Sequence, residues 1–425
     1  MTTDSNSVSR RGLFSAAGKG TLVASIATGI TAPFRSLGGV AWAAETPKKV
    51  QKWILTKNVG DDNKLTMEHF KLVEEPMPQV KQGEALVKVL LCNIHANTRN
   101  LMKKGGSTKV GETDKTNYSI AQVLQSRDKT FKEGNTITCA GGWNTYQTTS
   151  SDLSREDVGA GHGAPHEFAL VEEQNGTNSR TAYVFRPVML KQFKPDVLMD
   201  VYGTSGLTAY YGVRECGPIM PRDRIAVAGT TGSVGAMAAQ ICKAKGAYVV
   251  GFGGGPERAK WVVDNLGMDV GLDYRDKDLE AKLKAAFPEG IDVYVDGVGG
   301  PLSEAVAKLM NRDGRYFSYG GAAKIYQDEQ PKASMMANAK EYGMTDLIEK
   351  IIKERHIKLE AWNQAVWSQD RIEAENKLSQ LMNTGKLKAV NNVVKGFENI
   401  PKGIISQYDG VKEYYGKLQL QYDAD

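Results

Sequence analysis

The stretch Arg224-Ile-Ala-Val-Ala-Gly-Thr-Thr-Gly-Ser-Val-Gly235 decides the fold of this chain. A buried apolar run leads into a turn with Gly229, Gly232 and Gly235, and a helical pattern follows over residues 234–245. Glycines at this spacing let the backbone turn tightly, approach a pyrophosphate and pack the helix on the strand. The N-terminus of the helix offers N–H groups and a positive dipole end to phosphates. The stretch therefore predicts a dinucleotide site; a tight turn that binds nothing is the alternative.

Strands and helices are predicted to alternate around this turn, from about residue 196 to 320. The predicted strands are 224–228, 247–252, 270–274, 291–295 and 314–319, and the predicted helices are 234–245 and 256–266. This alternation is typical of βαβ units that build a parallel sheet. The sequence therefore predicts an α/β fold with a doubly wound, Rossmann-type sheet.

The regions on either side have a different pattern. Between about 50 and 193 the chain shows short strands and turns, and the clearest strands are 85–91 and 117–124. Residues 148–191 are polar and irregular, which predicts a long surface excursion. After about residue 357 a helix at 370–382 and a strand at 417–421 are expected. A chain of 425 residues is long enough for two domains or three.

The end of the second strand, 247–252, distinguishes two cofactors. Sites for NAD usually have Asp or Glu there, because a carboxylate binds the ribose 2′-hydroxyl. Here Gly253-Gly254-Gly255 ends the strand, and Arg258 and Lys260 follow. A guanidinium pairs with a phosphate through charge-assisted hydrogen bonds. The pattern favours NADP, with Gly254, Arg258 and Lys260 in its site; solvated helix charges are the alternative.

The composition excludes other classes of function. The formal net charge is only +5, from 54 Lys and Arg against 49 Asp and Glu, so no nucleic-acid partner is indicated. Two short groups, Cys92 with His95 and His162 with His166, lack the further ligands of a zinc site, and no metal is predicted. The four cysteines are too far apart for a disulfide-dense scaffold or a four-cysteine zinc site; they are at positions 92, 139, 216 and 242.

Residues 1–43 have the features of an export signal in the right order. Arg10 and Arg11 precede a weakly apolar stretch at 13–33 and then the small-x-small pattern Ala41-Trp-Ala43. The arginine pair resembles the twin-arginine signal. No run near 20 apolar residues is present, so no permanent membrane span is expected. We predict the twin-arginine export machinery as a partner and a periplasmic location; a disordered tail with a chance arginine pair is the alternative.

Seven motifs together are specific for one group of enzymes. They are Gly206-Leu-Thr-Ala-Tyr-Tyr-Gly212, the glycine turn at 229–235, Val249 to Arg258, Leu272-Asp-Tyr274, Val298-Gly-Gly300, Gly396-Phe-Glu-Asn-Ile-Pro401 and Gly416-Lys-Leu418. They resemble the medium-chain dehydrogenase/reductase superfamily, in particular its zinc-free branch of NADP-dependent alkenal, prostaglandin and leukotriene reductases.

The resemblance implies how the domains and the subunits are organised. A Rossmann domain is inserted into a GroES-like, barrel-like, mainly β catalytic domain that both ends of the chain form. We expect the signal peptide at 1–43, the catalytic domain at 44–195 and 351–425, and the NADP-binding domain at 196–350. A homodimer is also expected from the resemblance.

The resemblance also implies roles for residues at matching positions. The pyrophosphate would lie on Gly232, Ser233 and Val234, and the 2′-phosphate would lie beside Arg258 and Tyr274. Tyr319, which ends the strand 314–319, is included in the predicted cofactor site. Tyr326 stands near a tyrosine that the branch has after the following loop.

The substrate side departs from this branch. Where the branch usually has Asp-Pro-Tyr-Met-Arg, this chain has His95-Ala-Asn-Thr-Arg99, and Gly297 stands where an Asn is usual. Reduction of an activated alkene needs an oriented nicotinamide and a donor to the enolate oxygen. Tyr326 is the first candidate donor, and His95 or Arg99 is the second. The departures leave the identity of the small-molecule substrate open.

The predicted function is hydride transfer between NADP(H) and an activated alkene or quinone-like molecule, by an exported and zinc-independent oxidoreductase. The periplasm is not expected to supply free NADPH, so we expect the cofactor to travel bound and to be retained. Two alternatives stay open. One is a non-catalytic ligand- or partner-binding protein on a reductase scaffold, and the other is a cytoplasmic reductase with a misinterpreted leader.

Overall fold

The structure is a computed structural model that describes residues 47–94, 96, 98–114, 117–151, 172–173, 176–177, 182–320, 339–340, 342–361, 371–408 and 414–422. The predicted signal peptide, His95, Tyr326, His162 and His166 lie outside these residues, as does most of the predicted excursion at 148–191. Within the described ranges, no helix is long and apolar enough to cross a membrane.

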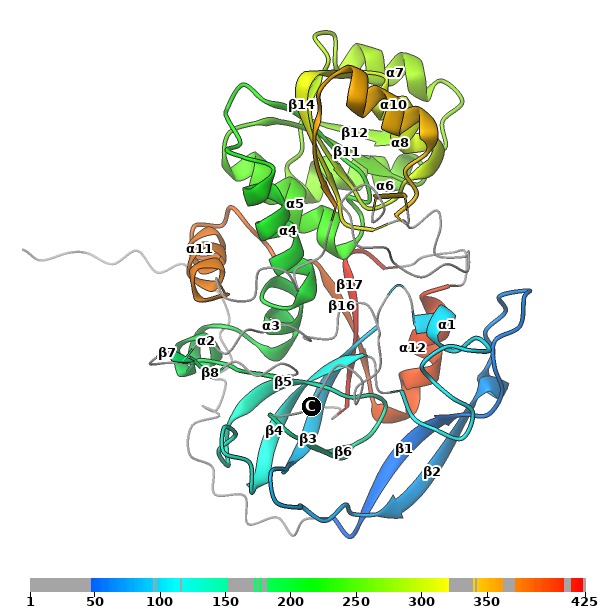
Figure 1. Cartoon of the computed structure of the whole chain (residues 1–425), viewed down its shortest axis with the longest axis vertical. Helices are drawn as coiled ribbons and strands as arrows, with labels where there is room; N and C mark the ends of the chain where they lie inside the picture. The colour runs from blue at the N-terminus through cyan, green and yellow to red at the C-terminus, as the bar shows by residue number, and fades with distance from the viewer. Residues whose placement is uncertain are drawn as a thin grey trace, which may run out of the picture. The chain divides into compact units, whose positions relative to one another are not determined.

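Six strands form a parallel sheet in the order β12-β11-β10-β13-β14-β15. Figure 1 labels β11, β12 and β14 of this sheet. The bounds of the six strands are β10 Arg224–Val227, β11 Tyr248–Gly253, β12 Val270–Asp273, β13 Ile291–Asp296, β14 Met310–Ser318 and β15 Lys358–Ala361. The strand order reverses between β10 and β13, and sheets of this type bind ligands at the carboxyl ends of the strands at such a point. The predicted doubly wound sheet is confirmed.

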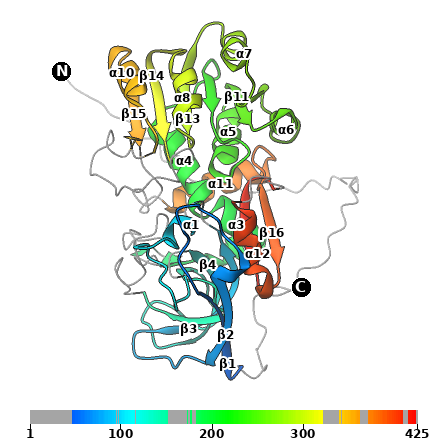
Figure 2. The same cartoon turned by 90° about the vertical axis from the view of Figure 1, so that its right-hand side faces the viewer.

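Helices cover both faces of this sheet, because its strands are apolar on both sides. Ile225 and Val227 of β10 pack in one core with helices α4, α5 and α6, whereas Ala226 and Ala228 pack in a second core with α7, α8 and α10. Figure 2 labels these six helices around the sheet. The alternation follows from the two-residue period of a strand. The bounds are α4 Thr204–Glu215, α5 Ser233–Ala244, α6 Pro256–Leu266, α7 Leu279–Ala286, α8 Gly300–Ala307 and α10 Asp346–Glu354.

A second sheet of seven strands combines segments from both ends of the chain. Its order is β16-β17-β3-β4-β5-β9, and β6 pairs with β3 outside this path. Strand β17 runs antiparallel to β3 and parallel to β16, which confirms that the C-terminal region returns to the first part of the chain. The bounds are β3 Ala85–Asn93, β4 Tyr118–Ser126, β5 Thr136–Ala140, β6 Tyr146–Thr149, β9 Ala182–Val184, β16 Asn391–Lys395 and β17 Lys417–Gln421.

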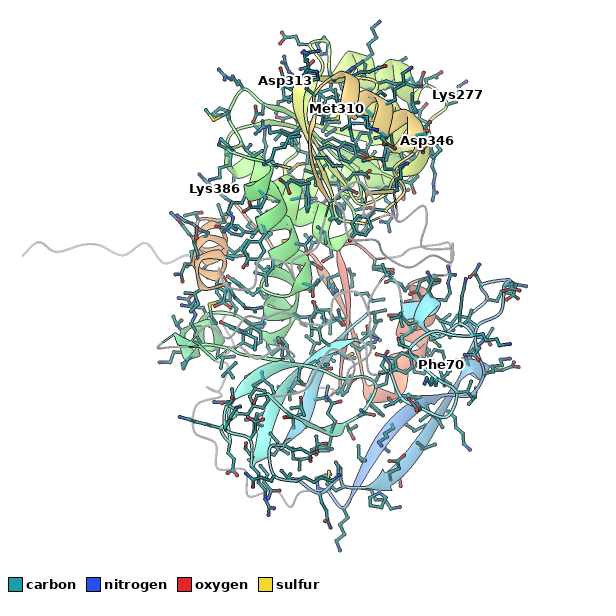
Figure 3. The ribbon with its side chains drawn as sticks, viewed as in Figure 1. Phe70, Lys277, Met310, Asp313, Asp346 and Lys386 are labelled. Atoms are coloured by element: carbon teal, nitrogen blue, oxygen red, sulfur yellow. The ribbon has the colours of Figure 1, made fainter. Side chains whose placement is uncertain are left out.

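Smaller elements complete the part of the chain around this sheet. Phe70 starts β2 and packs edge-on against Trp143, with ring centroids 5.6 Å apart, in a third core that includes Ile400 and Ile404 of α12 (Figure 3). The other elements are β1 Lys49–Leu55, β2 Phe70–Pro76, β7 Glu172–Glu173, β8 Gly176–Thr177, α1 Thr98–Leu101, α2 Pro187–Gln192, α3 Pro195–Val201, α11 Arg371–Asn383 and α12 Ile400–Ser406, with 3-10 turns at Met67–His69 and Phe397–Asn399.

The parallel sheet corrects one predicted domain boundary. The NADP-binding domain was expected to end at residue 350, but that position lies inside α10. Strand β15 pairs with β14 as the sixth strand of the sheet, so the sheet runs to Ala361. The prediction stopped too early because the four residues of β15, Lys-Leu-Glu-Ala, carry a weak strand pattern.

The contact between α5 and the end of β10 depends on Gly235. A Cβ atom at this position would lie 2.3 Å from the carbonyl oxygen of Gly229. Real Cβ contacts are never this short, so only glycine lets the first turn of α5 approach the strand so closely.

We expect Gly235→Ala to lower the free energy of unfolding by about 1–3 kcal/mol, because the added methyl group must push helix and strand apart. Denaturant unfolding of the purified variant measures this loss. The matched control is Gly320→Ala, where a Cβ would meet no atom within 4 Å, and its stability should stay near that of the wild type. Equal stability of the two variants would contradict the proposed packing constraint.

Candidate active site

The glycine-rich turn places five of the predicted cofactor residues together. Gly229 has a φ of +66°, and Gly232 is the N-cap of α5 without a side-chain capping bond. The first-turn N–H groups of a helix have no partner within the helix. Ser233, Val234 and Gly235 form this first turn, which directs its N–H groups and positive dipole end to the ligand side of β10. This geometry fits a pyrophosphate.

Gly254 and Tyr274 come together where β11 and β12 end, and Arg258 lies in the first turn of α6, which follows β11. A Cβ at Gly254 would lie 2.7 Å from the hydroxyl oxygen of Tyr274, so glycine is needed beneath this ring. The Asp273 carboxylate accepts the N–H groups of Gly255 and Arg275, at 2.8 and 2.9 Å, and thereby shapes the two loops. No carboxylate stands at the last residue of β11, which is Gly253. The arrangement suits a 2′-phosphate better than a free 2′-hydroxyl.

Lys260 is separated from these residues. Residues two apart on a helix do not share a face, so Lys260 and Arg258 point to different sides of α6. Lys260 is largely exposed and forms an ion pair with Asp264 one turn along the helix. The structure therefore brings Arg258 to the predicted cofactor site, but it does not bring Lys260 there.

Tyr319 lies over the glycine turn at the point where the strand order reverses. Its hydroxyl donates to the carbonyl oxygen of Ala228 at 3.3 Å, and burial raises the pKa of this hydroxyl. A Cβ at Gly297 would lie 2.2 Å from the Tyr319 ring. The absence of a side chain at 297 therefore makes room for Tyr319, a coupling that the sequence alone did not indicate.

Of the three predicted catalytic residues, only Arg99 is described. Its guanidinium donates to the Asn63 carbonyl oxygen at 3.1 Å and lies 4.5 Å from the centre of the Tyr408 ring. Its backbone N–H donates to the Tyr408 hydroxyl at 2.9 Å. These contacts hold α1 against the turn that follows α12. They do not connect Arg99 with the glycine turn, and His95 and Tyr326 lie outside the described residues.

A buried carboxyl group that no sequence motif indicated lies beside the glycine turn. Asp200 of α3 accepts the Ser233 hydroxyl at 3.0 Å and the backbone N–H of Val390 at 2.9 Å. Burial raises its pKa to about 7, against the opposing effect of these two hydrogen bonds. Its signal in the sequence is an aspartate within the apolar run Val197-Leu-Met-Asp-Val-Tyr202. Asp200 thus links α3, the first turn of α5 and the segment before β16.

A segment near the C-terminus was also missed as part of the site. The backbone N–H of Gly416 donates to the carbonyl oxygen of Thr231 at 2.9 Å, inside the glycine turn. Arg258 donates to the carbonyl oxygen of Tyr414 at 2.8 Å. Strand β17 of the seven-stranded sheet therefore starts directly beside the predicted cofactor site. The adjacent motif Gly416-Lys-Leu418 was the only signal for it in the sequence.

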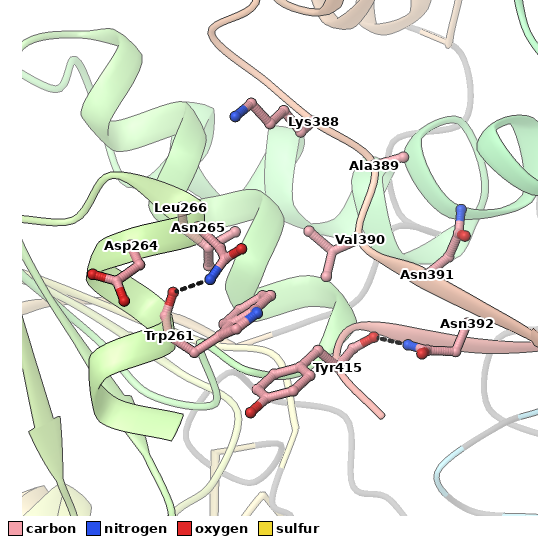
Figure 4. Close-up of a pocket in the computed structure, with 10 residues that line it drawn as sticks. All are labelled: Trp261, Asp264, Asn265, Leu266, Lys388, Ala389, Val390, Asn391, Asn392 and Tyr415. Atoms are coloured by element: carbon pink, nitrogen blue, oxygen red, sulfur yellow. Dashed lines mark hydrogen bonds between the residues drawn. The ribbon is translucent and has the colours of Figure 1, made fainter. Parts of the chain in front are cut away.

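A cavity of about 340 Å³ lies beside this segment, between α6 and the residues that precede β16 (Figure 4). Trp261, Asp264, Asn265 and Leu266 line it from α6, and Lys388 to Asn392 and Tyr415 line it from the other side. Arg258 is not among the residues that line this cavity, and it lies on α6 one helical turn before Trp261.

The cysteine thiols in the described part of the chain are buried. No group of three or more His, Cys, Asp or Glu side chains there could hold a metal ion. The Cys92 thiol is buried, and burial raises its pKa to about 12. A thiol in this state is a poor nucleophile and a poor metal ligand.

Comparisons with known proteins agree with this geometry. Residues 51–155 match the N-terminal domain of oxidoreductases, and residues 233–348 match the zinc-binding dehydrogenases. The chain is 28% identical over 367 residues to prostaglandin reductase 1 of Bos taurus, and the aligned region covers 85% of this chain and 96% of that protein. It is 26% identical over 368 residues to the NADPH-dependent curcumin reductase of Escherichia coli (strain K12), and the aligned region covers 84% of this chain and 93% of that protein.

Among solved structures, CurA of Vibrio vulnificus in complex with NADPH is similar, with a TM-score of 0.69 at 23% identity, and 88% of this chain and 100% of that chain are covered. The fold is that of the medium-chain dehydrogenases and reductases. Together with the two family matches, it places this chain in the medium-chain dehydrogenase/reductase superfamily.

The raised pKa of Asp200 leads to a pH-dependent stability. The pKa is 3.8 for an ordinary aspartate and about 7 here, so the folded state binds the proton more tightly than the unfolded state does. The resulting stability is fully present below pH 3.8 and is lost as the pH rises through about 7. We expect the wild type to lose stability relative to Asp200→Asn over this range, as measured by unfolding at each pH. A constant difference between the two proteins would contradict this assignment.

Proposed function

We propose that this chain is an exported, zinc-independent reductase that uses NADPH to reduce an activated C=C bond or a quinone-like small molecule. The observation that carries the proposal is the glycine turn before α5, with Arg258 in the first turn of α6 and Tyr274 directly after β12. The turn supplies the pyrophosphate contacts, and the two side chains supply a place for the 2′-phosphate.

The predicted class of enzyme and the predicted cofactor are confirmed. The relatives described above are a prostaglandin reductase and an NADPH-dependent curcumin reductase, and the similar CurA structure contains NADPH. The finer assignment, an enone, an enal or a quinone-like molecule as substrate, is part of the proposal. It is supported by the names of the reductase relatives.

The side chains have separate tasks in this mechanism. When bound, NADPH supplies a hydride for the β-carbon of the substrate. The first turn of α5 binds the pyrophosphate, and Arg258 binds the 2′-phosphate, so the nicotinamide end is held in one place. Tyr319 fills the space above Gly229 and Gly297, so its ring would form one wall of the cofactor site at the carboxyl ends of β10 and β13. Tyr326 is proposed as the hydrogen-bond donor to the enolate oxygen.

The proposal includes export through the twin-arginine pathway and retention of NADP. Arg10 and Arg11 support the first part, together with the cleavage pattern at Ala41-Trp-Ala43. This pathway carries folded proteins, so a cofactor bound in the cytoplasm can travel with the chain. Two contacts support retention. Gly416 bonds to Thr231 in the glycine turn, and Tyr414 accepts a hydrogen bond from Arg258. A homodimer is also proposed.

An activity assay tests the reductase. The purified chain should oxidise NADPH when a conjugated ketone or aldehyde is added, and a metal chelator should not change the rate. Tyr326→Phe should lower turnover by roughly 10²-fold, as loss of a donor to a developing oxyanion does. Unchanged turnover would remove Tyr326 from the mechanism. A chain that neither contains nucleotide nor uses NADPH would support the non-catalytic alternative.

Cell fractionation tests the export. A processed chain that starts near Ala44 should be found in the periplasm, and mass spectrometry of the purified protein should detect NADP. The double variant Arg10→Lys, Arg11→Lys should keep the unprocessed chain in the cytosol. If the wild-type chain is found only in the cytosol and at full length, the export proposal is wrong and the cytoplasmic alternative holds.

A further inference from the structure

Two aromatic residues accompany Arg258 at the domain contact. The guanidinium carbon of Arg258 lies 4.3 Å from the centre of the Tyr415 ring. The same ring stacks on Trp261, with centroids 4.2 Å apart and planes 19° from parallel (Figure 4). Arg258 and Trp261 are three residues apart on α6, so they share the face of the helix that Tyr415 covers.

The position of Tyr415 is fixed by its own backbone. The next residue, Gly416, donates its N–H to the Thr231 carbonyl oxygen at 2.9 Å and forms a bridge with Gly232. Gly416 has a φ of +73°, and a Cβ there would lie 1.8 Å from the Val390 carbonyl oxygen. The segment is therefore held between the glycine turn and residue 390, and Tyr415 has little freedom to move away from α6.

These contacts restrict Arg258 before any ligand arrives. The Tyr414 carbonyl oxygen accepts one N–H of the guanidinium at 2.8 Å, while the Tyr415 ring covers its face. A guanidinium has five N–H donors in a planar fork, so one side chain can make this anchoring bond and also bind a phosphate. A side chain that is already ordered loses less rotamer freedom when its ligand binds.

We propose that Tyr415, supported by Trp261, is a positioning residue for recognition of the 2′-phosphate. It comes from the catalytic domain and holds the guanidinium of Arg258, on the nucleotide-binding domain, in the orientation that binds this phosphate. This inference rests on the proposed function, because it requires Arg258 to bind the 2′-phosphate of NADP. Its consequence is selectivity for NADPH over NADH, since NADH lacks the group that Arg258 binds.

Direct binding measurements on the full chain test this role without relying on turnover. Affinities for NADPH and NADH are measured by nucleotide fluorescence for the wild type, Tyr415→Leu and Tyr415→Phe. We expect Tyr415→Leu to weaken NADPH binding by roughly three- to tenfold, the size of a partly exposed cation–π contact, and to leave NADH binding unchanged. Tyr415→Phe keeps the ring and should restore the wild-type preference.

The variant Arg258→Ala tests the 2′-phosphate site of the proposed function separately from the positioning role of Tyr415. It should weaken NADPH binding and not NADH binding, and adding Tyr415→Leu to it should cause no further loss. If Arg258→Ala weakens both nucleotides equally, the 2′-phosphate site of the proposed function is wrong. If Arg258→Ala is selective but Tyr415→Leu affects both nucleotides alike or neither, the positioning role of Tyr415 is overturned.

A second variant covers the case in which Tyr415→Leu does not fold. Trp261→Leu removes the stacking partner of the ring and leaves the backbone contacts of Gly416 in place. It should show the same selective loss of NADPH affinity, and equal effects on the two nucleotides would again overturn the positioning role.

Discussion

The close approach of α5 to the end of β10 is the constraint on which the rest of the structure depends. Gly235 lets the helix begin against the carbonyl oxygen of Gly229, and so the helix N-terminus faces the ligand side of the sheet. The parallel order β12-β11-β10-β13-β14-β15 then brings the ends of β11 and β12 to the same edge. Arg258 and Tyr274 reach the site only because these strands run in the same direction.

Polar contacts connect the glycine turn with segments of the catalytic domain before β16 and β17. Asp200 bonds both Ser233 and Val390, and Gly416 bonds Thr231. A buried carboxyl group without partners is costly, so the geometry that satisfies Asp200 also keeps α3, α5 and the segment before β16 in one arrangement. The cofactor turn is therefore shaped by both sheets.

Gly297, a departure from the family pattern, makes room for a side chain of the neighbouring strand. Gly297 looked like the loss of a polar side chain when the sequence was considered alone. In the structure the Tyr319 ring occupies the space that a side chain at 297 would need. The two positions are 22 residues apart in the chain, and they meet because β13 and β14 are neighbouring strands.

The sequence by itself determined the doubly wound sheet, the glycine turn and the preference for NADP, whereas the return of β17 to the seven-stranded sheet was expected only from the family resemblance. The first three features depend on local patterns, namely apolar runs, glycine spacing and the charge that follows a strand. Only the tertiary structure decided that β15 belongs to the parallel sheet, that Lys260 points away from Arg258, and that Asp200 and Tyr415 lie at the site. Such contacts join residues far apart in the chain, and no local pattern records which distant side chain a folded backbone brings within hydrogen-bonding or stacking distance.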